Sequence, residues 1–334
     1  MRGDNKISAR QLLVCIYLAV SAEMLIKPFR EPIRFPAQVL LPAAAFNLLL
    51  VGLLLWPLQR GIGERGWLAT PARGLTAALL LLSAGVTVNE ANGFLGFIGE
   101  WQLPFFLFLL LVLGLIYYAV RLGSEGFARV GGVLLVLFLG SILLIAVSNL
   151  QDLQLENLDA GPLPVREIGQ AMQNGFYLSP DFLAGAVLTD RVADRPRLRW
   201  KGMLVAVFAT YALFALLSEL VLGGFAWSQR QPVYTLARIG SLSVFRRLDS
   251  LHASIWLMAL LLKLILETAA AERLIQGFLP QRGKRYSVLL SVLLVAGVSL
   301  VLHAGFPQGV FRWMTWGGVA AAVLLALAGK GEKR

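Results

Sequence analysis

Six ionisable side chains lie inside otherwise apolar stretches of the sequence. A charge at the centre of a bilayer costs roughly 3 kcal/mol on insertion scales, so such groups usually pair, bind a solute or pass protons. No nucleophile elbow, phosphate loop or metal-binding spacing accompanies them, so we expect no enzyme activity, no metal and no cofactor. The six are Glu23, Glu90, Asp181, Glu219, Lys263 and Glu267.

Asp181 closes a segment that interrupts an apolar stretch, residues 174–181 (Asn-Gly-Phe-Tyr-Leu-Ser-Pro-Asp). Pro180 has no backbone N–H to donate, and Gly175 tolerates non-helical angles. Unwound backbone at membrane depth is tolerated where it lines a cavity or is buried in protein. The segment therefore predicts a binding site, and a simple proline kink is the alternative.

Glu23 comes late in the first apolar stretch, which runs into the proline-rich residues 27–32. Interrupted spans at corresponding places in two halves indicate a transporter's binding site. A carboxylate here could pair with the ammonium of an amino acid, and amides at the start of the next half-helix could take its carboxylate. The predicted ligand-binding residues are Ala22, Glu23, Asn89, Tyr177, Leu178, Ser179 and Asp181.

Lys263 and Glu267 are four residues apart in one apolar stretch, the spacing of an intrahelical ion pair. Either they form such a structural pair, or Lys263 is a fixed positive charge in place of a coupling cation. Such a charge would disfavour sodium coupling, because it repels a second cation. For Glu90 and Glu219 we expect positions near the outer membrane interface.

The composition indicates an integral membrane protein. Of the 334 residues, 57% are hydrophobic and 15% charged, which is well below the charged share of soluble domains. The single cysteine excludes an internal disulfide, and two histidines are too few for a metal cage. The net charge of +11 fits basic cytoplasmic loops rather than nucleic-acid binding. Residues 61–66 match a dinucleotide-binding fingerprint, but they follow a span rather than a strand.

Ten apolar stretches have the length of membrane-spanning helices. We expect one polytopic membrane domain over residues 1–334, with repeats at about 11–149 and 168–328. Most of the 30 Lys and Arg residues then lie on the side of the termini, which predicts that both termini are cytoplasmic. The predicted spans are 11–26, 36–56, 73–96, 103–120, 130–149, 168–190, 202–222, 248–271, 287–303 and 312–328.

Residues 244–263 resemble the eighth span of the GerAB-type family, the permease-like B subunits of bacterial spore germinant receptors. In that family an Arg-(Leu/Ile)-Asp/Glu element precedes a helix that carries Ile-Trp and then a lysine. Residues 234–238 and 6–12 are similar to the family's outer-loop helix and to its opening. The matching positions of the eighth span are Arg247, Leu248, Asp249, Ile255, Trp256 and Lys263.

The resemblance implies an all-α transporter fold of the amino-acid/polyamine/organocation superfamily, with about ten helices in a five-plus-five inverted repeat and helices 1 and 6 interrupted. It also implies a small germinant such as an amino acid, A-type and C-type partner subunits, and the spore inner membrane. Residues 20–24 and 178–181 differ from the family's pattern at the two breaks, so the ligand-binding residues are predicted from this chain alone.

Three functions follow as hypotheses. The first is a germinant-receptor subunit that binds a small solute and relays a conformational change to its partners. The second is a proton-coupled or facilitative amino-acid transporter of the same fold. The third is a structural membrane subunit whose site no longer binds a ligand.

Overall fold

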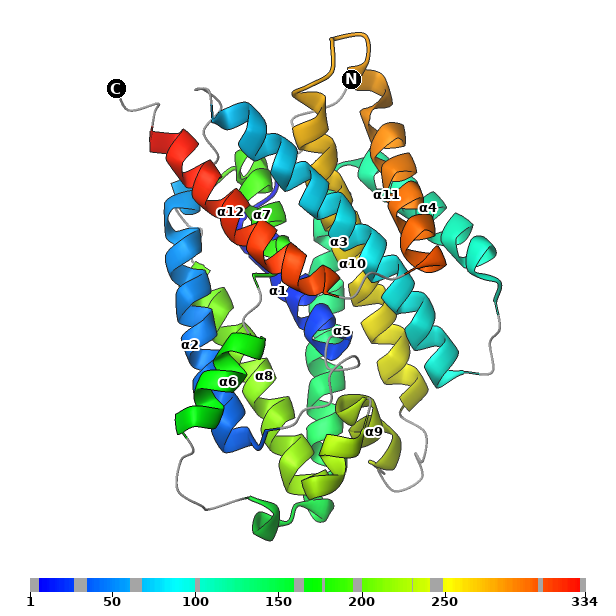
Figure 1. Cartoon of the computed structure of the whole chain (residues 1–334). Helices are drawn as coiled ribbons and strands as arrows, with labels where there is room; N and C mark the ends of the chain where they lie inside the picture. Colours follow the sequence, from blue (N-terminus) through cyan, green and yellow to red (C-terminus); the bar gives the residue numbers. More distant parts are fainter. Residues whose placement is uncertain are drawn as a thin grey trace.

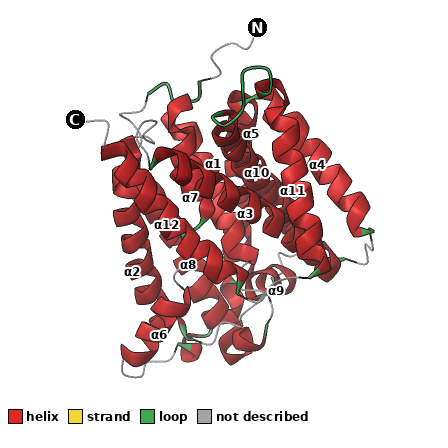
Figure 2. Ribbon diagram, turned by 45° about the horizontal axis from the view of Figure 1, so that its top comes forward, coloured by secondary structure: helices red, strands yellow, loops and turns green. Residues whose placement is uncertain are grey.

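The computed structural model is an all-helical bundle, shown in Figure 1 and, turned, in Figure 2. Within its described part the only β contact is an isolated bridge between Ile7 and Val192. The structure describes residues 6–26, 35–60, 68–99, 103–158, 165–175, 178–194, 200–229, 231–240, 249–305 and 309–330.

The helices follow one another with short connections. They are α1 (Ala9–Ile26), α2 (Ala37–Leu55), α3 (Ala69–Ile98), α4 (Phe105–Leu122), α5 (Ser124–Ser148), α6 (Val165–Gly175), α7 (Pro180–Val187), α8 (Trp200–Leu222), α9 (Pro232–Ile239), α10 (Asp249–Gln276), α11 (Ser287–Ala304) and α12 (Val310–Lys330).

Eight helices in the described part of the chain are long and apolar enough to cross a membrane, which makes the chain a multi-pass membrane protein. They are α2, α3, α4, α5, α8, α10, α11 and α12. The other two predicted spans fall on the 18-residue α1 and on the pair α6 and α7. The interruption predicted at residues 174–181 agrees with the helix bounds, because α6 ends at Gly175 and α7 begins at Pro180. That α6 and α7 together form one membrane span stays a prediction. Residues 27–32 lie outside the described residues.

Burial separates central helices from lipid-facing ones. In the apolar window of α10, 78% of the residues are buried, and in that of α3 67%, against 22% for α2 and for α4. The outward faces of α4 and α5 expose large aliphatic side chains, as contact with lipid tails requires. These include Leu110, Leu111, Leu115, Val133, Val136 and Leu143. Most positions on α10 and α3 are therefore enclosed by protein.

Two glycines allow the central helices to approach one another closely. A Cβ atom at Gly185 of α7 would overlap Ile16 of α1 and lie 3.0 Å from the Trp200 ring of α8. A Cβ atom at Gly85 of α3 would overlap Val298 of α11. Small residues at such contacts are the usual means by which membrane helices pack tightly.

The start of α1 is joined to the segment that follows α7. Ile7 donates its N–H to the carbonyl of Arg191, 3.0 Å away, and accepts from the N–H of Ala193 at 3.0 Å. The N–H of Ala9 donates to Oδ1 of Asp194. α1 thus begins, and the α7 segment ends, at the end of the bundle where α12 also ends (Figure 1).

Candidate functional site

The break between α6 and α7 positions the first site residues. Ser179 is the N-cap of α7, and its Oγ accepts from the N–H of Asp181 at 3.3 Å. Pro180 fits the first helical position, where an N–H has no intrahelical partner in any case. The cap and the proline together fix the direction in which the Asp181 side chain leaves the helix.

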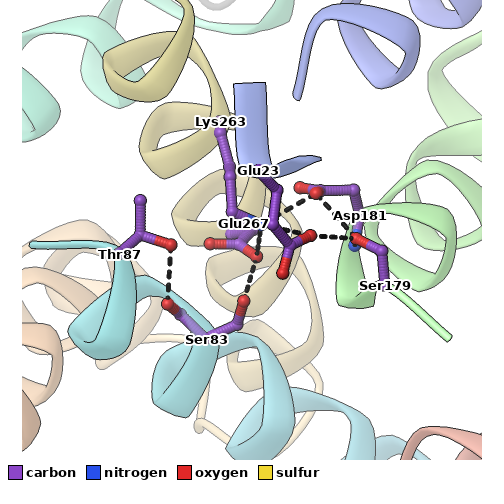
Figure 3. A network of polar contacts seen from close by, with 7 residues as sticks. All are labelled: Glu23, Ser83, Thr87, Ser179, Asp181, Lys263 and Glu267. Atoms are coloured by element: carbon purple, nitrogen blue, oxygen red, sulfur yellow. Dashed lines mark hydrogen bonds and ion pairs between the residues drawn. The ribbon is translucent and has the colours of Figure 1, made fainter. Parts of the chain in front are cut away.

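Lys263 of α10 lies at the centre of a buried ionic cluster (Figure 3). Its Nζ atom is 2.7 Å from Oδ2 of Asp181, 2.8 Å from Oε1 of Glu267 and 3.5 Å from Oε2 of Glu23. The carboxylates come from α7, α10 and α1, so one ammonium connects three elements that are far apart in sequence.

Hydroxyl groups complete the cluster from two sides. Ser179 Oγ lies 2.7 Å from Oε2 of Glu23 and 2.8 Å from Oδ2 of Asp181. From α3, the Ser83 hydroxyl donates to Oε1 of Glu267 at 2.5 Å, and Thr87 donates to the Ser83 carbonyl. Figure 3 shows these two α3 residues on the opposite side of Glu267 from Ser179.

The cluster holds three carboxyl groups and one ammonium, all nearly inaccessible to solvent. The side chains of Lys263, Asp181 and Glu267 are at most 1% exposed, and that of Glu23 is 7% exposed. Removal of charges from water is costly, and attraction offsets that cost only when opposite charges balance. With all four groups ionised, two negative charges would remain without a counter-charge, so the arrangement favours binding of positive charge.

Two carboxyl oxygens in the cluster have no hydrogen-bond partner among the residues that the structure describes. They are Oδ1 of Asp181 and Oε2 of Glu267, on side chains that are fully buried. Buried polar atoms in folded proteins nearly always find a partner, because an unmade bond loses the hydration of the group. Each of these oxygens can accept a hydrogen bond from an ammonium group, or it can bind a proton.

The structure brings together five of the residues predicted from sequence, namely Glu23, Ser179, Asp181, Lys263 and Glu267. Ala22 and Leu178 are buried next to them in the chain. Asn89 is not part of the cluster: its amide donates to the Gly85 and Ser299 carbonyls and so joins α3 to α11. Tyr177 lies outside the described residues.

Ser83 and Thr87 were not predicted as site residues. A weak signal exists in the sequence, because Thr76, Ser83, Thr87 and Glu90 recur at helical spacing along one apolar stretch. Hydroxyl groups are common in membrane helices, where they often bond to their own backbone, as Thr76 does with Ala72. The spacing alone therefore does not distinguish the hydroxyl that reaches Glu267.

Glu219 bonds to the start of a neighbouring helix, and its expected position near the membrane interface stays a prediction. It is buried at the end of α8, and its Oε2 accepts from the N–H of Ala37, the first residue of α2. A carboxylate at a helix N-terminus satisfies an unpaired donor and complements the helix dipole. Glu90 is also buried, at 9% exposed.

Five polar or aromatic side chains of α10 form one buried stripe. With about 3.6 residues per turn, Asp249, His252, Trp256, Lys263 and Glu267 lie on the same side of the helix, and all five are buried. In the first turns of α10, Ser141 of α5 lies 2.6 Å from Nδ1 of His252. The stripe runs from the end of the bundle beside α9 to the central cluster.

Neither the cluster nor the stripe has the geometry of a metal centre. Within the described residues, no three His, Cys, Asp and Glu side chains are arranged to hold a metal ion.

No protein-family model matches the chain, and no curated protein matches it either. The chemistry of the cluster is therefore the basis for any functional interpretation.

Proposed function

We propose that the chain is a permease-like membrane subunit that binds a small ammonium-bearing solute at the Glu23–Asp181–Lys263 cluster and relays the resulting shift to partner subunits. The supporting observation is that the broken sixth span places Ser179 and Asp181 beside Glu23 and Lys263. In the terms of the sequence resemblance, it is the B subunit of a spore germinant receptor, with A-type and C-type partners in the spore inner membrane.

The packing pattern supports a ten-helix repeat of five plus five. Suppose that α1, α2, α3, α4 and α5 are exchanged, in that order, with α6/α7, α8, α10, α11 and α12. Most pairs of helices that pack together then become other pairs that also pack together. Thus α3 packs on α11 and α12, and α10 on α4 and α5; likewise α1 packs on α8, and α6 on α2. α6 lies at the end of the bundle opposite to the start of α1, as inverted repeats require (Figure 1).

Lys263 would change its partners between two conformations of the protein. Its ammonium occupies the position on Asp181 that the ammonium of a solute would take. A solute that displaces Lys263 from Asp181 would leave Lys263 on Glu267, on its own helix. The contact between α10 and α7 would then be exchanged for one through the solute, and such a difference between two states can shift their populations.

The test is a thermal-shift screen of the purified chain against amino acids and simple amines. A ligand at about 100 times its dissociation constant stabilises a fold by roughly 2.7 kcal/mol, which such a screen detects. We expect a selective shift that is lost in Asp181→Asn and kept in Asp190→Asn. Asp190 lies at the end of the same segment and bonds to Arg273, away from the cluster. Binding that survives Asp181→Asn unchanged would contradict the proposal.

A second candidate is a proton-coupled transporter of the same fold. The excess of buried carboxyl groups and the buried stripe of α10 favour it, because protons can occupy acids that lack a counter-charge. In proteoliposomes a transporter accumulates labelled solute under a pH gradient, whereas a sensor binds it without accumulation. Accumulation that requires Asp181 would favour this candidate over the receptor subunit.

A further inference from the structure

The charges available at the cluster differ for the two ends of an amino acid. For an ammonium there are three carboxyl groups, two of which carry an oxygen without a partner among the described residues. For a carboxylate there is one cation, Lys263, which is the only lysine or arginine among the buried described residues. That lysine already contacts all three carboxyl groups.

The first N–H groups of α7 already have acceptors within the chain. Pro180 has no N–H, the N–H of Asp181 donates to Ser179 Oγ, and that of Phe182 donates to the Ser179 carbonyl at 3.1 Å. Capture of a solute carboxylate by these two amides would require each to give up its present acceptor. A zwitterion would also bring its negative charge to a group that already has an excess of acids.

We infer that the site takes a cationic amine without a carboxylate and exchanges it for protons. This inference rests on the proposed function and narrows its solute class. In the amine-free protein, Lys263 is charged and two of the three carboxyl groups carry protons, so the cluster is neutral. Each ammonium that binds replaces one carboxyl proton, which leaves to the solvent, and the total charge of the occupied cluster stays unchanged.

Within the described part of the chain, the groups that bond to the cluster from α3 and the next titratable groups along α10 do not alter this balance. α3 contributes the neutral Ser83 and Thr87. The next titratable groups along α10 have other partners: His252 bonds to Ser141 of α5, and Glu272 accepts from Ser287 and Gln276. A diamine carries as many charges as the two protons it replaces. We therefore expect it to bind more tightly than a monoamine of the same length.

The experiment compares four probes on the full purified chain: 1,4-diaminobutane, butylamine, alanine and butyrate. Thermal shift gives affinity, and a pH indicator in weak buffer gives proton release. We expect affinity to fall at least tenfold from the diamine to butylamine, and no binding of alanine or butyrate. Proton release should approach two per diamine and one per butylamine.

The outcomes separate the inference from the proposed function. If alanine binds as tightly as butylamine, or if amines bind without proton release, the inference is wrong while solute binding stands. If no probe shifts the unfolding temperature of folded protein, both are wrong.

A matched pair of variants on one helix tests the role of the cluster. Glu267→Gln removes a carboxyl group that contacts Lys263, and Glu272→Gln makes the same change five residues away, outside the cluster. We expect Glu267→Gln to lower diamine affinity at least tenfold and to reduce its proton release to about one, as the exchange stoichiometry requires. Glu272→Gln should bind as the unaltered chain does. Equal losses in both variants would overturn the assignment.

Discussion

α10 holds the α7 segment through two ionic contacts that differ in kind. Near its middle, Lys263 contacts Asp181 and two further carboxyl groups, and it is 1% exposed. Ten residues later, Arg273 contacts Asp190 through two nitrogens, 2.6 and 2.8 Å from the same oxygen, and these side chains are 37% and 30% exposed. The outer contact pairs one positive with one negative group and is partly exposed to solvent. The inner contact is buried and has more carboxyl groups than cations. This difference is the one expected if the outer pair fastens the segment and the inner cluster is the proposed binding site.

The largest effect is expected from loss of the central ammonium. Lys263→Met should destabilise the fold by about 3–5 kcal/mol, because it leaves buried carboxyl groups without a counter-charge. The folded variant should then bind more protons than the unfolded chain, so its stability should fall as pH rises. Thermal unfolding in detergent at several pH values measures both effects.

The control for this prediction is Lys201→Met. Lys201 is exposed at the start of α8, where its Nζ lies 5.4 Å from the centre of the Trp56 ring. This variant should unfold close to the temperature of the unaltered chain at every pH. A Lys263→Met protein with the same behaviour would remove the distinction between the buried and the exposed contact.

A smaller loss of stability is expected from Gly185→Ala. Gly185 lies in α7, between Asp181 and Asp190 in the chain. The added methyl group would overlap Ile16 and press on Trp200, and overpacking of this kind costs about 1–3 kcal/mol. Gly114→Ala on the lipid-facing side of α4 has nothing within 4 Å and should cause no loss. Equal unfolding temperatures for the two variants would contradict the close approach of α7 to α1.

Ser179→Ala should cost about 1 kcal/mol as a lost helix cap. The variant should also bind amine more weakly, because the hydroxyl connects Glu23 with Asp181. Thermal unfolding with and without butylamine measures the two effects. Ser254→Ala removes an exposed hydroxyl that bonds only to the Ser250 carbonyl, and it should change neither quantity. A Ser179→Ala protein identical to this control would exclude the cap from the site.

The smallest effect is expected at the outer contact. Arg273→Gln should cost about 1 kcal/mol or less, and high salt should abolish the difference because the pair is partly exposed. Unfolding temperatures at low and high salt provide the measurement. The deficit of Lys263→Met should persist in high salt, since ions do not reach a buried cluster. If the loss of stability in Arg273→Gln does not depend on salt, the two contacts do not differ in the way described.

The helices and the central break could be predicted because their causes are local. Apolar length sets the spans, and Pro180 with Gly175 interrupts the sixth one wherever the rest of the chain lies. The spacing of Lys263 and Glu267 also predicts their contact, since four residues make about one helical turn.

The remaining parts of the site depend on packing between distant segments. Nothing near Ser83 in the sequence indicates that its hydroxyl meets Glu267, 184 residues later. Asn89 was among the predicted ligand-binding residues, and nothing near it in the sequence indicates that its amide donates to a carbonyl of α11. The use of the α7 amides by Ser179 follows from the cap geometry, which the sequence motif leaves open.

The backbone bonds between Ile7 and the residues after α7 have a kinetic consequence. They join Ile7 to a segment more than 180 positions later, so separation of α1 from the end of the α7 segment requires that these bonds break. The rate at which the site opens toward that end should therefore depend on those few bonds. Deletion of the residues before Ala9 should speed solute release more than it changes the equilibrium occupancy.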